Sequence, residues 1–470
     1  MKRKEMYKRL VKTALIALLL AGEIAVYYAV WMKYYNPQMR VPYDVRGNYM
    51  IAAVYGIVVF IFLHIYGGMN IGYFRIWNLA YSHILTVICS NALIYLQITL
   101  LIKYFHTVMP LLAMTFVEVI IIIAWSFAAT SIYCRLYPPR KVCLVYGERP
   151  VSNLATKFHT RTDRFDVCEL INVSAGLDEI KKKAKKYEGV VIGDIPSHMR
   201  NSLLKYCYGE SIRTYTVPKL SDIIVRSAES LHMFDTPLLL SRNTGFNVEQ
   251  SIAKRLMDIV CSVLALVLAS PIMLCTAAAI KLYDGGPVLF SQKRCTKDGR
   301  VFEIYKFRSM IVDAEKEGRP IPATEGDPRI TPVGKIIRAA RIDELPQFIN
   351  ILKGDMSLVG PRPERIEHVE KYTEAIPEFP YRLKVKGGLT GYAQVYGKYN
   401  TSAYDKLKLD LMYIENYSLL LDIEILFKTI KILLLKESTE GFDDRVSQAM
   451  FEREINKKDE GRKRDDESSG

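Results

Sequence analysis

The chain has 470 residues, half of them hydrophobic, which is enough for about three domains of ~100–200 residues. Its net charge of +14 suits nucleic acid, an anionic membrane surface or a phosphorylated substrate as partner. The eight cysteines occur singly, without a CxxC pair or a histidine at zinc-ligand spacing. This pattern argues against a disulfide framework and a zinc site, and predicts reduced, mostly buried thiols.

Four long apolar stretches each approach the ~20 residues that span a bilayer, at residues 13–32, 49–66, 81–102 and 108–131. They predict transmembrane helices, the first a retained anchor without a small-residue cleavage site. With the amino terminus inside, ten cationic residues flank the inner side and four the outer side. We therefore expect both termini in the cytoplasm, and partners at a lipid bilayer with no nucleic acid.

Three polar residues interrupt these stretches near mid-bilayer depth: Glu23, Glu118 and Asn91. An ionisable group there is costly and is often functional or paired. The simpler interpretation is that these groups form hydrogen bonds between helices, and we favour it over a channel.

Short β-rich runs alternate with polar helical patterns from residue 141 to about 237, which predicts a small βαβ sheet. The expected strands are residues 142–146, 165–170, 189–192 and 213–217. The first ends in VYGERP, which offers one glycine where a dinucleotide fingerprint needs three, and Pro150 lacks an N–H. We expect a Rossmann-like α/β domain with a structural or regulatory role.

A further apolar run, residues 256–280, is long enough to cross a membrane but has positive charge on both flanks, which contradicts a simple crossing. Pro271, after Ser270, lacks the N–H that would bond the carbonyl of Val267, so a helix bends there. Each arm is then about 10–15 residues, too short to span. A re-entrant helix over residues 254–281 fits both features, with a fifth ordinary span as the alternative.

The stretch 289–363 holds the groups that phosphoryl transfer needs. Arg341-Ile342-Asp343-Glu344 places two adjacent carboxylates among positive charges, which should lower both pKa values. One carboxylate can attack phosphorus while the other holds Mg²⁺ as cofactor. Six cations can bind phosphate oxygens: Lys306, Arg308, Arg329, Arg338, Arg341 and Arg362.

Two simpler interpretations stay open at this point. Asp343 can be the N-cap of a helix, because Pro346 and the apolar FINIL run after it resemble a helix start. The apolar segment 418–436 can lie along a membrane surface or be an ordinary core helix.

From residue 254 to about 441 the chain resembles the bacterial sugar transferases, the monotopic phosphoglycosyl transferases. The resemblance rests on the ordered blocks KRLMDIVCSVLALVLASPIML, GGPVLFSQKR, FEIYKFRSM, DPRITPVGKIIR, DELPQFINILKGDMSLVGPRPE, GLTGYAQVYGKYN and LDLMYIENYSLLLDIEILFKTI. With the four preceding spans and the βαβ module, the chain resembles the long form of the family, the polyprenyl-phosphate hexose-1-phosphate transferases that initiate exopolysaccharide or capsule synthesis.

The resemblance implies roles for particular residues. Asp343 is the nucleophile and Glu344 the metal-binding carboxylate. Ser270 and Pro271 form the break of the re-entrant helix, and Lys254 and Arg255 are the basic pair that opens it at the membrane surface. Arg362, in PRP, is a ligand for the nucleotide or its phosphates. The implied substrates are a UDP-sugar and polyprenyl (undecaprenyl) phosphate. Gly387-Gly388 departs from the Pro-Gly of many members.

The predicted fold class is a multi-domain membrane protein: a four-helix transmembrane domain (1–135), a Rossmann-like α/β domain (136–240), a monotopic α/β catalytic domain with the re-entrant helix (241–440) and a charged, disordered tail (441–470). A homodimer, and a place at the cytoplasmic face of the bacterial inner membrane, are further expectations. Two other function classes stay open: a membrane-anchored nucleotide-sugar dehydratase, which needs a glycine-rich NAD loop, and a non-enzymatic assembly or regulatory protein. No motif records which hexose is transferred.

Overall fold

The computed structural model describes residues 6–147, 152–241, 245–312, 314, 327–398 and 401–434. These fall into two compact units, one of the described residues up to Val217 and one of those from Pro218 onward. The predicted tail (441–470) and the Glu148–Pro150 end of VYGERP lie outside the described residues.

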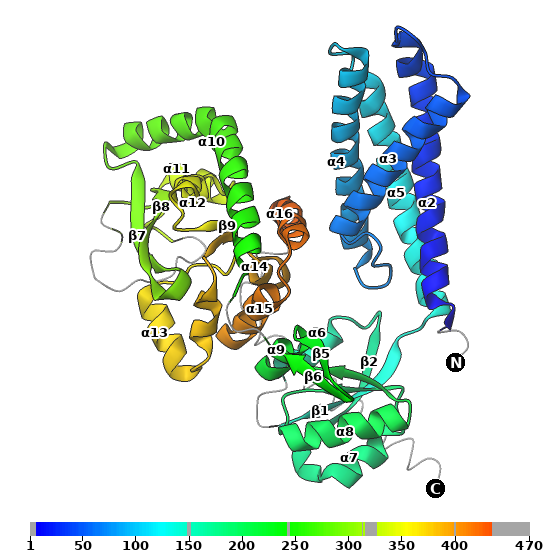
Figure 1. The fold of residues 1–470 in the computed structure, drawn as a ribbon, viewed down its shortest axis with the longest axis vertical. Helices are drawn as coiled ribbons and strands as arrows, with labels where there is room; N and C mark the ends of the chain where they lie inside the picture. The colour runs from blue at the N-terminus through cyan, green and yellow to red at the C-terminus, as the bar shows by residue number, and fades with distance from the viewer. Residues whose placement is uncertain are drawn as a thin grey trace. The chain divides into compact units, whose positions relative to one another are not determined.

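The first unit begins with four long apolar helices, α2 to α5, as the hydropathy predicted (Figure 1). Each is long and apolar enough to cross a membrane. Large hydrophobic side chains stay exposed along them, as a lipid-facing surface requires. Their bounds are Lys8–Val30, Val45–Ile65, Ile76–Ile102 and Met109–Leu136, and α2 continues through Trp31–Tyr35 and Asn36–Gln38.

A buried polar cluster joins these helices. Glu118 of α5 accepts hydrogen bonds from Tyr55 of α3, at 2.8 Å, and from the amide of Asn91 of α4, at 2.9 Å. Asn91 also donates to Thr115 at 2.8 Å. The predicted hydrogen bonds between helices are confirmed for Glu118 and Asn91. Glu23 of α2 is buried as well, with Oε1 unpartnered among the described residues.

After α5, four parallel strands form a sheet in the order β2-β1-β3-β4. Alternate residues of β1 face opposite sides: Cys143 and Val145 pack with α7 and α8, whereas Val142 and Leu144 pack with α6. The predicted strands are confirmed. The bounds are β1 Arg140–Tyr146, α6 Ser152–His159, β2 Phe165–Asn172, α7 Leu177–Ala184, β3 Gly189–Ile192, α8 Ser197–Gly209 and β4 Arg213–Thr216.

The lack of a side chain at Gly147, which follows β1, has a structural reason. A Cβ at this position would lie 2.6 Å from the backbone oxygen of Asp194, in the loop after β3. The glycine therefore permits a close approach of two loops at one end of the sheet.

The second unit surrounds a continuous core that joins α9, β8, α12, β9, α15 and α16. Its strands form three two-stranded sheets, β5/β6 and β7/β8 antiparallel and β9/β10 parallel. The bounds are α9 Leu220–Arg226, β5 Glu229–Met233, β6 Thr236–Leu240, α10 Val248–Asp284, β7 Leu289–Cys295, β8 Val301–Phe307, α11 Pro332–Ala339, α12 Gln347–Lys353, β9 Ser357–Val359, α13 Ile366–Ala375, β10 Gly388–Thr390, α14 Tyr392–Tyr396, α15 Ala403–Glu415 and α16 Leu419–Leu434.

Helix α10 is continuous from Val248 to Asp284, but its ribbon bends sharply in Figure 1. Pro271 lies inside it and has no N–H for the carbonyl of Val267. The hydroxyl of Ser270 donates to that carbonyl at 2.8 Å. Ser270 thus supplies the donor that Pro271 removes, which explains why the chain can bend here without leaving the carbonyl unsatisfied. The predicted bend is confirmed.

Candidate active site

Asp343 and Glu344 lie in the short 3₁₀ turn Ile342–Glu344 between α11 and α12. The N-cap of α12 is Pro346, so the prediction that Asp343 caps this helix is wrong. Oδ1 of Asp343 is buried and has no hydrogen-bond partner among the described residues. A buried acceptor without a donor is costly, so this oxygen is poised to meet a ligand.

Glu344 is held by positive charge from three directions. Nζ of Lys306, on β8, and Nη2 of Arg362, after β9, each lie 3.0 Å from Oε1. Arg341 lies 3.9 Å from the same oxygen. Burial would raise the pKa of Glu344, but the charges of Arg362 and Lys306 outweigh it and hold the pKa well below its usual range. Glu344 is therefore an anion at every physiological pH.

Asp343 behaves differently from its neighbour. Burial raises its pKa, and the charge of Glu344 adds to this effect, while Lys306 acts in the opposite direction. The expectation that both pKa values fall is correct for Glu344 and wrong for Asp343. The physical reason is that the cations contact Glu344, whereas Asp343 loses solvent without gaining a donor.

Two of the arginines predicted to bind phosphate form ion pairs with other carboxylates. Arg308 pairs with Asp284 at the end of α10. Arg329 pairs with Asp327 at 2.6 Å. Arg338, in the last turn of α11, acts on Asp343 through its charge. Lys306, Arg341 and Arg362 are thus the predicted cations that the fold brings to Glu344 itself.

An ion pair that the sequence analysis missed fixes the backbone of Arg362. Nε and Nη2 of Arg382 contact Oδ2 of Asp410 at 2.9 and 2.8 Å, and both side chains are buried. Nη2 of Arg382 also donates to the carbonyl of Arg362 at 3.0 Å. A signal was available: Asp410 occupies the apolar face of the pattern in α15, where a charge indicates a buried partner.

The basic pair at the start of α10 requires a correction. The side chain of Lys254 is 7% exposed and forms an ion pair with Asp422 of α16 at 2.5 Å. It is therefore a buried residue that links α10 to α16, and not a membrane-surface cation. Tyr413 completes the cluster, donating to Asp422 at 2.7 Å. Arg255 donates to the carbonyls of Ile351 and Leu352. Both carbonyls lie in the last turn of α12, and that of Ile351 also accepts from the N–H of Gly354. Arg255 therefore adds a side-chain cap to the helix that follows the carboxylate pair.

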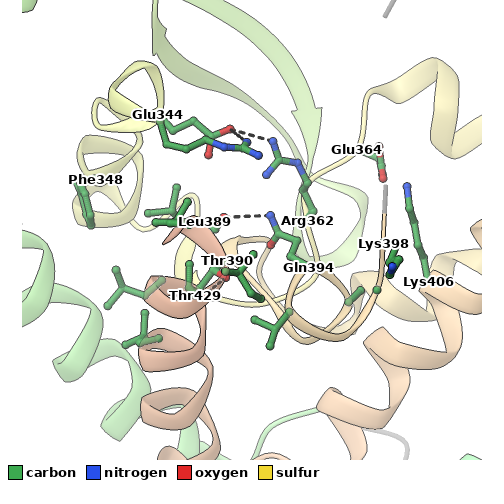
Figure 2. Close-up of a pocket in the computed structure, with 18 of the residues that line it drawn as sticks. Glu344, Phe348, Arg362, Glu364, Leu389, Thr390, Gln394, Lys398, Lys406 and Thr429 are labelled. Carbon is green, nitrogen blue, oxygen red and sulfur yellow. Dashed lines mark hydrogen bonds and ion pairs between the residues drawn. The ribbon is translucent and has the colours of Figure 1, made fainter. Parts of the chain in front are cut away.

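A cavity of about 570 Å³ opens beside Glu344 (Figure 2). Arg341 and Arg362, which lie 3.9 and 3.0 Å from the Glu344 carboxylate, line it, and so do Gln394 and Thr390. The other residues that line it are Leu345, Phe348, Leu358, Glu364, Arg382, Leu389, Ala393, Val395, Gly397, Lys398, Lys406, Leu426, Thr429, Ile432 and Leu433.

The carboxylate pair has the right donors for a magnesium ion. The described residues contain no cluster of three His, Cys, Asp or Glu side chains. Magnesium is, however, usually bound by one or two carboxylates together with substrate phosphates. Glu344, whose cationic contacts all fall on Oε1, has its second carboxylate oxygen for such an ion, and Oδ1 of the adjacent Asp343 stays available for the substrate.

Comparison with known proteins identifies the family. The model of the bacterial sugar transferase family matches residues 249–436. A UDP-N-acetylgalactosamine-undecaprenyl-phosphate N-acetylgalactosaminephosphotransferase of Aeromonas hydrophila is 42% identical over 268 residues, 55% of this chain and 62% of that protein. A UDP-glucose:undecaprenyl-phosphate glucose-1-phosphate transferase of Klebsiella pneumoniae is 36% identical over 271 residues, 56% of each chain.

A third relative is matched over most of its length. The sugar transferase EpsL of Bacillus subtilis, itself uncharacterised, is 41% identical over 186 residues, which cover 40% of this chain and 89% of that protein. The chain therefore belongs to the bacterial sugar transferase family. It spans little more than half the length of the Aeromonas and Klebsiella proteins.

Proposed function

We propose that this protein transfers a hexose 1-phosphate from a UDP-sugar to polyprenyl phosphate, with Asp343 as the nucleophile. The observation that carries the proposal is the buried, unpartnered oxygen of Asp343 beside a glutamate that Lys306 and Arg362 keep ionised. The printed names of the Aeromonas and Klebsiella relatives describe transfer from UDP-sugars to undecaprenyl phosphate. Initiation of exopolysaccharide or capsule synthesis is the biological role that fits this activity.

In the first step the Asp343 carboxylate attacks the β-phosphorus of the UDP-sugar. An acyl phosphate bond forms between Asp343 and the β-phosphorus as the bond from that phosphorus to the bridging oxygen breaks, and UMP leaves with this oxygen. Arg362 and Arg341, which line the cavity beside Glu344, neutralise the phosphate oxygens. Magnesium, if held partly by Glu344, would add charge neutralisation at the same oxygens.

In the second step a phosphate oxygen of the polyprenyl phosphate attacks the same phosphorus. The acyl phosphate bond to Asp343 breaks, the carboxylate is regenerated, and polyprenyl diphosphate-hexose is released. Because the nucleophile is regenerated, each turnover consumes one UDP-sugar and one acceptor. Glu344 stays ionised throughout and keeps Lys306 and Arg362 in place.

The membrane arrangement follows from the helices. We infer that α2 to α5 form a four-helix bundle across the bacterial inner membrane, and that α10 enters and leaves the same leaflet at its bend. Exposed leucines along α10, such as Leu264, Leu268 and Leu274, would then face lipid. The positive charge around α10 favours the cytoplasmic side, where UDP-sugars are found. The parallel sheet would be a Rossmann-like accessory domain.

The test uses the full chain, purified in detergent. We expect UMP release when polyprenyl phosphate and the correct UDP-sugar are added, with UDP-glucose, UDP-galactose and their N-acetylated relatives tried separately. Without acceptor, the parent should gain the mass of one hexose phosphate, and Asp343→Asn should not. Asp178→Asn, a change at a fully exposed aspartate of the first unit, is the matched control. Undiminished UMP release by Asp343→Asn would refute the assignment of the nucleophile.

A further inference from the structure

The cavity beside Glu344 has both apolar and cationic residues in its wall, and a ligand that fills it must fit both. Of its twenty lining residues, nine have aliphatic or aromatic side chains, so much of its wall cannot pair with polar groups. Five others are cationic: Arg341, Arg362, Arg382, Lys398 and Lys406. Asp410 neutralises Arg382, and the other four cations still outnumber the two glutamates of the wall, which favours an anionic group. The best-fitting ligand is an anionic head attached to an apolar body.

Part of the apolar wall comes from one face of α16. Leu426, Thr429, Ile432 and Leu433 recur at intervals of three and four residues, so they share a side of the helix. Phe348 of α12 adds an aromatic ring to the same cavity (Figure 2). We call these five residues the apolar lobe. Leu433 is 57% exposed, so the lobe is open at the end of α16 and does not close around a small ligand.

We propose that the apolar lobe binds the first isoprenyl units of the acceptor, with the acceptor phosphate at Arg341 and Arg362. The proposal rests on the proposed function, which supplies polyprenyl phosphate as the second substrate. A UDP-sugar is a poor occupant of the lobe, because its hydroxyl and imide groups would lose water against leucine and phenylalanine. An isoprenyl chain loses nothing there and gains burial.

The size of the cavity limits how much acceptor it holds. About 570 Å³ falls in the range of sites for drug-sized ligands, so a phosphate and the start of a chain fit while a full polyprenyl chain does not. The rest of the chain would leave past Leu433. This geometry brings the acceptor phosphate beside Glu344, and hence next to the residue that carries the sugar phosphate.

The proposal predicts a selective effect of Leu433→Ser. The KM for polyprenyl phosphate should rise about tenfold, the usual size of a lost apolar contact in a binding pocket. The KM for the UDP-sugar, and the UMP burst measured without acceptor, should stay within about twofold. Farnesyl phosphate, a short acceptor, should suffer the same fold-loss as undecaprenyl phosphate, because only the first units contact the lobe.

Leu420→Ser is the matched control. Leu420 is on the same helix and 77% exposed, but it is not among the residues that line the cavity, so both KM values should stay at those of the parent. Ala393→Phe gives an independent test, since a ring in the cavity should exclude the chain and raise the acceptor KM.

Three results for Leu433→Ser would overturn the proposal. A rise in the KM for the UDP-sugar would make the lobe a donor site, and no change in either KM would mean that the lobe binds neither substrate. A loss confined to the long acceptor would indicate anchoring by distal isoprenyl units. An absence of UMP release by the parent would instead contradict the proposed function. The two failures are therefore distinguishable.

Discussion

Arg362 and Lys306 donate to the same carboxylate oxygen of Glu344, each at 3.0 Å, and leave the adjacent Asp343 without a donor at Oδ1. This arrangement gives two neighbouring carboxylates different pKa values and different contacts. Glu344 is neutralised by fixed cations, while Asp343 is buried, with a raised pKa and an available oxygen. An oxygen that no donor occupies is a better nucleophile than one engaged in an ion pair, which supports the assignment of Asp343.

The pH dependence of the reaction should report the ionisation of Asp343. Attack requires the carboxylate, and the pKa of Asp343 is raised, so kcat/KM should fall as pH drops through that raised value. Lys306→Gln removes a charge that lowers this pKa. We therefore expect the acidic limb of the kcat/KM profile to move to higher pH in this variant.

Lys353→Gln is the control for this experiment. Lys353 is on α12 and donates to Tyr305 at 2.9 Å, so its loss should leave the acidic limb where it is in the parent. If Lys306→Gln lowers the rate but does not move the limb, a group other than Asp343 governs the profile.

The buried pair of Arg382 and Asp410 should position Arg362. Asp410→Leu removes the carboxylate that the buried Arg382 contacts at 2.8 Å and leaves it with Glu364 at 3.7 Å, which should cost about 3–5 kcal/mol of stability. The double variant Arg382→Met with Asp410→Leu should recover much of that stability, because it removes both charges of the buried pair. Its UMP release should nevertheless stay about 100-fold low, because the carbonyl of Arg362 has lost its donor. Full activity in the folded double variant would show that the pair serves stability alone.

Local patterns in the sequence predicted the elements well. The four apolar helices and the strands β1 to β4 are found where hydropathy and β-rich alternation placed them. Ser270 and Pro271 identified the bend of α10 because a missing N–H has a local consequence. The carboxylate pair was found for a similar reason, since its cationic surroundings include near neighbours such as Arg341.

Burial and long-range pairing could not be predicted in the same way. Lys254 pairs with Asp422, 168 residues later, so nothing near Lys254 in the sequence indicates that it is buried. The raised pKa of Asp343 depends on loss of solvent, which only the folded chain determines. The charged neighbours in the sequence therefore led to the opposite sign for Asp343.

The hydroxyl of Ser270 should stabilise the bend of α10. Ser270→Ala removes the donor to the Val267 carbonyl and should lower stability by about 1–3 kcal/mol, seen as earlier thermal unfolding in detergent. In a Pro271→Ala background the backbone N–H returns, so the same serine change should cost little. A serine effect of equal size in both backgrounds would contradict the coupling, which a double-mutant cycle measures directly.

Gly387 should not accept a proline. Its N–H donates to Oγ1 of Thr296 at 3.2 Å, and a Cβ would lie 2.5 Å from Cγ of Pro363. Gly387→Pro loses both the hydrogen bond and the space, and should destabilise the protein by about 2–4 kcal/mol. Gly387→Ala keeps the N–H and should cost less. If thermal unfolding of both variants matches that of the parent, the loop has more freedom than this packing implies.

Arg341, which precedes the carboxylate pair, adopts a left-handed backbone conformation with φ 56°. Glycine adopts this conformation freely, whereas a side chain costs about 1–2 kcal/mol. Arg341→Gly should therefore be about 1 kcal/mol more stable than Arg341→Ala in thermal unfolding. Both variants lose the cation that lies 3.9 Å from Glu344 and lines the cavity, so both should show the same reduced kcat/KM for the UDP-sugar. Near-parental activity in Arg341→Gly with a loss in Arg341→Ala would mean that backbone geometry, and not the guanidinium, is what the reaction needs.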